Sequence, residues 1–334
     1  MAVEGVIFTQ IVDMNWDQAI YTASPNNTIN VAQFAAKGSG TNIGIALTPK
    51  GTGYISAQVP DGTVAGGNAR GANAVDLHTK RTVATAVASG ECSALVGGQQ
   101  CIASGTNSGC FGGTGNQATG TNSVCIGGAG STASGTNAVA LCDGVASGNN
   151  SVVGGSDCAA SGVTSFAIGV GAEATSDTAI SLGRYCKAYR MGMFAHGSTL
   201  FSAAGDVQFF RQVLANKTTT NAAVELFINQ AFGSVRMVLV ANTVLHAIVT
   251  VIGSKSDGSA VAKYIRQVTI KRVGSTTSLV GSVETIGVDE AAGTSIAITA
   301  DDANESLKIE ATGIAAETWR WVAVVEGAEL GIGA

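Results

Sequence analysis

The chain has 334 residues, of which 46% are hydrophobic and only 12% are charged, and its formal net charge is −5. This length allows two or three domains with cores of ordinary size. The acidic balance argues against a nucleic-acid partner or an anionic membrane surface, and no apolar run reaches the roughly 18 residues needed to insert a helix into a membrane.

Residues 1–64 carry mixed signals and lack the bulk for a large independent core. The segment 6–12 has the composition of a strand, and 24–27 that of a turn. Apolar residues alternate over 43–47 and again over 54–59, on either side of a Pro-Lys-Gly turn. This pattern predicts a β-hairpin.

Residues 65–200 repeat one phrase, and from Gly90 onward its starts are 13 to 15 residues apart. Its clearest form is Gly-Thr-Asn-Ser-Val-Cys-Ile-Gly-Gly, which begins at Gly120, and variants begin at Gly71, Gly90, Gly105, Gly135, Gly148, Gly162 and Ser176. In this unit Val124 and Ile126 alternate with Cys125, the period of a β-strand. Each unit has room for two short strands, with Gly, Asn and Ser at the corners. Such a unit buries its apolar face only when it is stacked on its neighbours, so the repeat predicts a parallel solenoid.

The composition of the repeats favours an ordered structure that associates with itself. Only five charged residues lie between residues 82 and 183, and none is Lys or Arg. A disordered tract would lack apolar β-branched residues, whereas every unit has an apolar residue at the same place. One thin coil would leave faces of Ala, Ser, Thr and Gly uncovered. Three copies packed about a common axis would cover them, so we expect a homotrimer.

The Asn-Ser-Val-x-Ile-Gly-Gly units, with Ala-Ser-Gly between them, resemble the head repeats of trimeric autotransporter adhesins, a repeat that also occurs in bacteriophage fibre proteins. The resemblance implies a left-handed parallel β-roll in a homotrimer. The flanks favour the phage proteins, because residues 1–5 lack the features of a secretory signal and no heptad tract follows. Residues 42–62 also look like the region just before the roll in phage fibres.

Residues 201–334 differ in composition from the repeats. Bulky and charged side chains appear over 184–194, as expected of a unit that ends a solenoid, and Lys, Arg and Glu then return. Eight strand candidates follow, at 207–214, 235–240, 244–252, 261–273, 278–286, 295–299, 306–311 and 319–326. This number of antiparallel strands suggests a β-sandwich or jelly roll, so the whole chain is expected to be all-β.

The seven cysteines form no Cys-x-x-Cys motif, and their number is odd, so a disulfide scaffold is not expected. Cys110 and Cys125 occupy the same repeat position and should stack on successive coils as small apolar residues. Buried reduced cysteines fit synthesis in a reducing cytoplasm, as for a virion protein. His78, His196 and His246 lie far apart in the sequence, and we predict neither a metal site nor a cofactor.

The sequence shows no recognisable catalytic motif. It lacks the Gly-x-Ser-x-Gly elbow and a phosphate-binding loop. The carboxylate pairs Asp289-Glu290 and Asp301-Asp302 are adjacent in sequence, and adjacent residues of a strand point to opposite faces, which makes them poor glycosidase pairs. Loop solvation or calcium binding is the commoner role of such pairs. We therefore expect no catalytic residues and no enzymatic activity.

Candidate ligand-binding residues lie in the strands predicted at 261–273 and 319–326. Trp319 and Trp321 are two residues apart and share one face, either as an exposed platform for a sugar or as a buried pair in the core or at the trimer axis. Tyr264, Arg266 and Arg320 are further surface candidates. A basic cluster at the start of the roll comprises Arg70, His78, Lys80 and Arg81. It is expected to be a solvated or trimer-interface cap, with Asp76 close enough to pair with one of its members.

The expected function is that of a homotrimeric viral fibre or spike, made in the host cytoplasm and carried on the virion. Residues 1–64 would mount on another virion protein or simply cap the roll, and the C-terminal domain would contact a host surface glycan or protein. The alternatives are a capsid decoration or head fibre without a receptor role, a bacterial trimeric adhesin, and a polysaccharide depolymerase.

Overall fold

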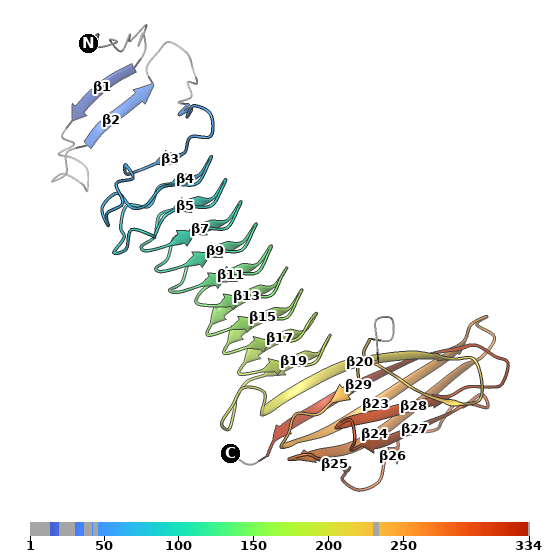
Figure 1. The fold of residues 1–334 in the computed structure, drawn as a ribbon. Helices are drawn as coiled ribbons and strands as arrows, with labels where there is room; N and C mark the ends of the chain where they lie inside the picture. Colours follow the sequence, from blue (N-terminus) through green and yellow to red (C-terminus); the bar gives the residue numbers. More distant parts are fainter. Residues whose placement is uncertain (1–13, 20–30, 37–41, 43–45, 230–233, 333–334) are drawn as a thin grey trace. The chain divides into compact units, whose positions relative to one another are not determined.

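The computed structural model describes residues 14–19, 31–36, 42, 46–229 and 234–332. The chain divides into two compact units, Met1–Gly51 and Thr52–Ala334. In the first unit, β1 (Met14–Ala19) and β2 (Val31–Ala36) form an antiparallel pair. The strand expected at 6–12 lies outside the described residues. The second unit contains the repeats and everything that follows them (Figure 1).

The repeats form a parallel solenoid, as the sequence predicted, and the described residues contain no helix. Successive coils add one strand each to two parallel sheets, and the strands are stacked in Figure 1. One sheet consists of β3 (Ile55–Ser56), β4 (Val75–Asp76), β5 (Ala94–Val96), β7 (Gly109–Phe111), β9 (Val124–Ile126), β11 (Val139–Leu141), β13 (Val152–Ser156), β15 (Phe166–Val170), β17 (Ile180–Arg184) and β19 (Phe194–Gly197). The other consists of β6 (Ile102–Ala103), β8 (Gln117–Ala118), β10 (Thr132–Ala133), β12 (Val145–Ala146), β14 (Ala159–Ala160), β16 (Glu173–Ala174) and β18 (Lys187–Ala188).

The hairpin predicted before the repeats does not form as expected. Its second arm contains β3, and β3 pairs in parallel with β4 as part of the solenoid. Part of its first arm, residues 43–45, lies outside the described residues. The alternation of apolar residues correctly identified an extended segment at 54–59. It gave the wrong pairing partner, because β3 pairs with β4 of the next coil, about 20 residues further along the chain.

The first glycine and the asparagine of the repeated phrase each have a structural reason. A Cβ on Gly120 would lie 2.1 Å from the carbonyl oxygen of Gly135 in the next coil, so only glycine fits there. Asn122 has a φ of 56°, in the left-handed region that asparagine tolerates better than most residues. Its side-chain amide donates to the Asn137 side chain one coil away, at 3.0 Å. The resulting amide ladder links Asn107, Asn122, Asn137 and Asn150.

The interior of the coils is built from small side chains. Cys110 stacks in register on Cys125, as predicted, and Ala140 and Val153 continue the column. All four are fully buried. The opposite sheet contributes a column of buried alanines, Ala103, Ala118, Ala133, Ala146, Ala160, Ala174 and Ala188. Cores this thin leave apolar residues on the outside.

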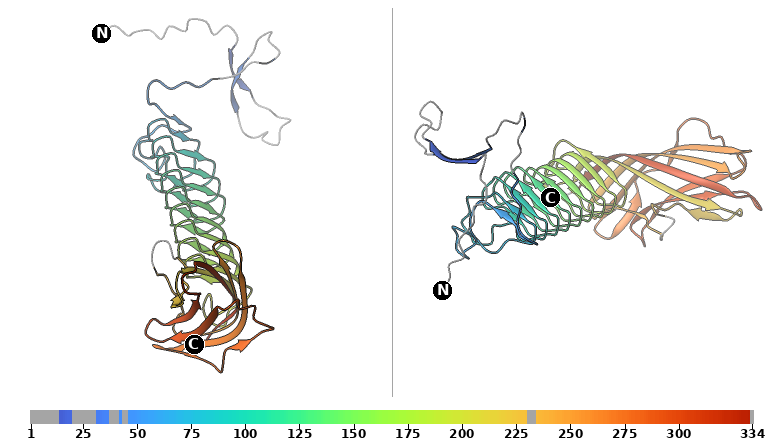
Figure 2. Two further views of the ribbon diagram at one scale, coloured as in Figure 1. Left: turned by 90° about the vertical axis from the view of Figure 1, so that its right-hand side faces the viewer. Right: turned by 90° about the horizontal axis from the view of Figure 1, so that it is seen from above.

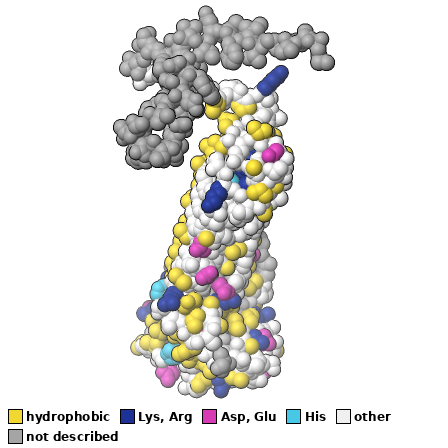
Figure 3. Space-filling view, turned by 90° about the vertical axis from the view of Figure 1, so that its left-hand side faces the viewer, with side chains coloured by type: hydrophobic (Ala, Val, Ile, Leu, Met, Phe, Trp, Pro, Cys, Tyr) yellow, Lys and Arg dark blue, Asp and Glu magenta, His cyan; other side chains and the backbone are white. Residues whose placement is uncertain are grey.

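An apolar column lies on the outer face of the first sheet. Val96, Phe111, Ile126 and Leu141 follow one another in register on four successive coils. The first three are 44%, 42% and 46% exposed. Figure 3 shows hydrophobic side chains along one face of the coils, with few charges among them. We refer to these four residues as the apolar column.

Two antiparallel sheets follow the coils (Figure 2). The first contains β20 (Val207–Thr218), β23 (Thr243–Lys255), β24 (Val261–Val273), β25 (Thr276–Leu279), β26 (Glu284–Thr285) and β29 (Trp319–Gly331). The second contains β21 (Ala223–Glu225), β22 (Met237–Val238), β27 (Ser295–Asp301) and β28 (Ser306–Thr312). Strand β20 pairs with β19, so the first sheet continues the parallel sheet of the coils. Buried residues of both sheets belong to one hydrophobic cluster, which extends into the coils.

Most of the predicted C-terminal strands are present, with two differences. The segment 278–286 is split between β25 and β26, and both pair with β24. Gly281, with a φ of 78°, interrupts the extended backbone there. Strand β21 has three residues and was not predicted, because a run this short has no measurable alternation.

Candidate functional site

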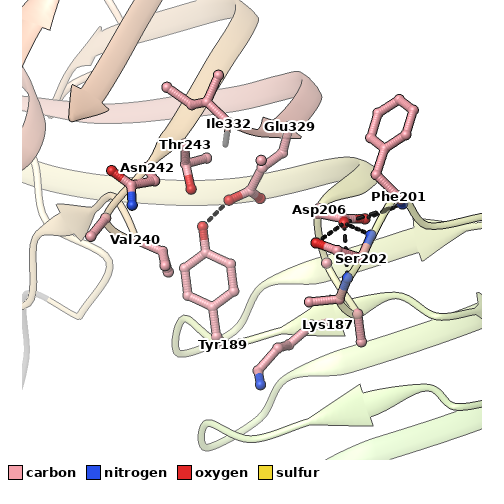
Figure 4. Close-up of a pocket in the computed structure, with 15 residues that line it drawn as sticks. Lys187, Tyr189, Phe201, Ser202, Asp206, Val240, Asn242, Thr243, Glu329 and Ile332 are labelled. Carbon is pink, nitrogen blue, oxygen red and sulfur yellow. Dashed lines mark hydrogen bonds between the residues drawn. The ribbon is translucent and has the colours of Figure 1, made fainter. Parts of the chain in front are cut away.

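A cavity of about 550 Å³ lies where the last coils meet the C-terminal sheets. One side is formed by Lys187 and Tyr189 of the coils and by the loop 201–206. The other side is formed by residues 240–243 and by Glu329 of β29. Figure 4 shows these side chains around the cavity, which we call the junction pocket. Its volume lies in the usual range for small-molecule sites.

The loop 201–206 is held in place by its own last residue. The Asp206 carboxylate accepts hydrogen bonds from the backbone N–H groups of Phe201 at 3.1 Å, Ser202 at 2.7 Å and Ala203 at 2.9 Å. Burial alone would raise the pKa of Asp206, but these amides together lower it. The Gly205 N–H donates to the Tyr185 carbonyl at 2.8 Å and ties the loop to the preceding coil.

The floor of the junction pocket is a buried polar cluster around Glu329. This side chain accepts hydrogen bonds from the Tyr189 hydroxyl, from Arg190 Nη2 at 3.3 Å and from Gln208 Nε2 at 3.0 Å. The Arg190 guanidinium also lies 4.4 Å from the centre of the Tyr189 ring. Burial raises the pKa of Tyr189 far above its usual range. The carboxylate therefore fixes the tyrosine and the arginine at the join between coil and sheet.

The walls combine apolar surface with hydrogen-bonding groups. Phe201 is 76% exposed and Val240 is 46% exposed, on opposite sides of the pocket in Figure 4. Asn242 Oδ1 accepts from the Gly274 N–H at 3.0 Å, and its amide nitrogen lies on the pocket side. Lys187 pairs with Glu173 at 2.6 Å. Since each charged side chain of the pocket already has a partner, the site suits a neutral ligand with both polar and apolar surface.

The predicted ligand-binding residues do not form a common surface. Trp319 and Trp321 are 0% and 1% exposed, with ring centres 5.7 Å apart. Their indole N–H groups donate to Glu317 at 2.9 Å and to Thr218 at 3.1 Å. The exposed aromatic platform is therefore absent, and the buried-pair alternative describes these residues.

The remaining predicted residues form no common exposed site, although the Arg266 guanidinium lies 5.6 Å from the centre of the Tyr264 ring. Tyr264 is 2% exposed and its hydroxyl lies 2.8 Å from that of Thr294, so its placement on the surface was wrong. Arg266 pairs with Asp289 at 2.6 Å. Arg320 is exposed, on the face of β29 opposite the two tryptophans. Its role in ligand binding remains a prediction.

The basic cluster at the start of the roll is buried rather than solvated, with the exception of Lys80. Arg70 pairs with Asp76 at 2.6 Å, as expected, and both side chains are inaccessible to solvent. Arg81 donates to the His78 carbonyl at 2.8 Å. Neither ring nitrogen of His78 has a hydrogen-bond partner among the described residues. The loops between the first coils enclose this cluster, which sequence spacing did not reveal.

Sequence reasoning missed the junction pocket. Its residues come from three separate stretches, and Tyr189 lies 140 residues from Glu329. The one local signal is Asp206 after Phe-Ser-Ala-Ala-Gly, a composition typical of a loop closed by an aspartate. In the described part of the chain, no group of three or more His, Cys, Asp or Glu could hold a metal ion. Nor does that part contain a helix suited to crossing a bilayer.

No protein-family model and no curated protein sequence matches the chain. Three phage tailspikes are among the solved structures that match the chain, all with low TM-scores. One is the tailspike gp49 of Acinetobacter baumannii phage Fri1, described as a capsular polysaccharide depolymerase, with 10% identity and a TM-score of 0.26 over 84% of this chain and 46% of that one. Another is the tailspike of Acinetobacter baumannii phage AM24, with 7% identity and a TM-score of 0.23 over 84% and 54%. A third is that of Acinetobacter phage vB_ApiP_P1, with 9% identity and a TM-score of 0.21 over 88% and 61%.

These neighbours correct one expectation. We predicted that the protein is not an enzyme, whereas the Fri1 tailspike is described as a depolymerase, and this finding contradicts the prediction. The chain spans about half the length of the first two structures. With TM-scores this low, we assign no residue of this chain a role from them.

Proposed function

We propose that the protein is a component of a bacteriophage spike or fibre, assembled as a homotrimer and carried on the virion. The coils act as a spacer and form a left-handed roll. The C-terminal sheets form a β-sandwich that contacts a glycan or protein of the host surface. Residues 1–64 attach the chain to another virion protein. The observation that carries this proposal is the stacked shaft joined directly to an antiparallel domain.

The apolar column supports assembly into trimers. Val96, Phe111 and Ile126 are each more than two-fifths exposed, on adjacent coils. A contiguous apolar strip of this kind on a soluble protein marks a surface that is covered by a partner. The shaft has few charges of its own, so a second and third copy can cover the strip without burying unpaired charge. Closed threefold symmetry would limit the assembly.

The proposal is tested on virus particles and on cells. Gold-labelled antibodies against the purified protein should decorate the particles that carry its gene. Fluorescently labelled protein should bind host cells and lose binding when the cells are stripped of surface polysaccharide or protein. Absence of label from intact particles would contradict the virion assignment. Incubation with the stripped polysaccharide, followed by an assay for reducing ends, measures any cleavage in the same experiment.

A further inference from the structure

We propose that the junction pocket is a binding site for a neutral sugar of a bacterial surface polysaccharide, with Phe201 as its stacking platform. This inference deepens the proposed contact with the host surface and rests on it. It differs from the site predicted at Trp319 and Trp321, whose rings are buried.

The first argument is that an exposed aromatic side chain projects from a loop whose backbone is fixed. Phe201 is 76% exposed, and a phenylalanine on a mobile loop would cover itself by collapsing onto nearby apolar surface. Its backbone N–H is fixed on Asp206, whose carbonyl in turn accepts from the Gly331 N–H at 2.7 Å. A Cβ on Gly205 would lie 2.9 Å from the Lys187 Cβ, so the loop packs closely on the last coils. A loop whose backbone is fixed before binding loses little conformational entropy on binding.

The second argument is the chemistry of the walls. A pyranose has an apolar face of C–H groups and a rim of hydroxyls. An aromatic ring offers a flat apolar surface to the C–H face. Asn242 and Thr243 offer hydrogen-bonding groups to the hydroxyls. The Asn242 amide oxygen is already engaged with Gly274, which leaves its amide nitrogen as a donor.

The third argument is charge. Glu329 pairs with Arg190, Lys187 pairs with Glu173, and Asp206 is held by backbone amides. A charged ligand would have to break the buried Arg190–Glu329 pair, which is costly, or replace Glu173 at the partly exposed Lys187, which would gain little. A neutral sugar avoids that cost. The volume of about 550 Å³ accommodates a terminal sugar or a short segment of a chain.

The test uses the full-length protein and a microarray of bacterial capsular polysaccharides and lipopolysaccharide glycans. The glycan that binds the unmodified protein most tightly is then titrated against three variants. Phe201→Ala removes the platform. Asn242→Asp keeps the oxygen that accepts from Gly274 and removes the amide donor. Phe209→Ala is the matched control, since Phe209 is 42% exposed on β20 and does not line the pocket.

We expect Phe201→Ala and Asn242→Asp each to weaken binding about 10-fold or more, and Phe209→Ala to leave it unchanged. If Phe201→Ala and Phe209→Ala bind the glycan equally well, the proposed sugar site in the junction pocket is wrong, although the protein still recognises a glycan. A change in the oligomeric mass of Phe201→Ala would also overturn it, because Phe201 would then be an assembly contact. If the unmodified protein binds no glycan, both the proposed sugar site and the proposed contact with a host glycan are wrong.

Discussion

Replacing one repeat glycine by alanine tests the stacking of the coils directly. A Cβ on Gly135 would lie 2.1 Å from the Gly148 carbonyl oxygen, whereas ordinary contact begins near 3.4 Å. The two coils would have to separate locally by roughly the difference, about 1.3 Å, against a normal strand spacing of about 4.8 Å. Hydrogen bonds such as Ser134 N–H to the Ala146 carbonyl, at 3.0 Å, would be stretched.

The expected cost follows from these contacts. Losing two or three backbone hydrogen bonds at about 1 kcal/mol each lowers the free energy of unfolding by about 2–3 kcal/mol, and the range for overpacking, about 1–3 kcal/mol, agrees with this. Gly154→Ala is the matched control, because the nearest atoms to its Cβ would be those of Ile168 at 3.4 Å and Leu141 at 3.9 Å, which are ordinary van der Waals contacts. That variant should remain within about 1 kcal/mol of the unmodified protein, and alanine limits the freedom of the unfolded chain.

Urea unfolding followed by far-UV circular dichroism, with hydrogen exchange to locate the opened coils, measures both variants. Gly135→Ala should unfold at lower urea concentration and lose exchange protection in the coils around residues 135 and 148. If Gly135→Ala and Gly154→Ala unfold at the same urea concentration, the close stacking of the coils described above is wrong.

Three further predictions concern the shaft. Burial, and then the charge of Arg81, lower the pKa of His78, so the unfolded chain binds a proton that the folded chain does not. Stability should therefore fall as the pH drops below about 6.5. The melting temperature should change less between pH 7.5 and pH 5.5 in His78→Leu than in the unmodified protein. An equal change in both proteins would refute this prediction. Thr164 has a φ of 58°, costly for a β-branched residue, so Thr164→Asn should raise the free energy of unfolding by about 0.5–1 kcal/mol, and a lower urea midpoint would count against it. Ile126→Lys places a charge in the apolar column and should reduce the mass measured by light scattering to that of one chain, 33.2 kDa. If the variant remains a trimer, the apolar column is not part of the interface between chains.

The repeats could be read from the sequence because their determinants are local. The spacing of Gly, Asn and Ser defines each corner, and each corner contacts the same corner of the next coil. For the same reason the stacking of Cys110 on Cys125 was predictable. The handedness and the number of chains depend on contacts between coils and between copies, about which periodicity carries no information.

The site could not be read from the sequence because it depends on long-range contacts. Alternation placed Trp319 and Trp321 on one face of a strand, but only the second antiparallel sheet determines that this face is buried. Asp76 was close enough to its arginines to be paired by spacing, yet their burial depends on loops of neighbouring coils. Tyr189 and Glu329 meet only because β29 pairs with β20, which pairs with the last coil.

The mass of the purified protein in solution is the most direct test of the proposal that the coils of three chains pack against one another. Sedimentation equilibrium should give three times the chain mass of 33.2 kDa, about 100 kDa, at micromolar concentration. A single species of 33.2 kDa would contradict the account, because the apolar column would then be exposed to water with nothing to cover it.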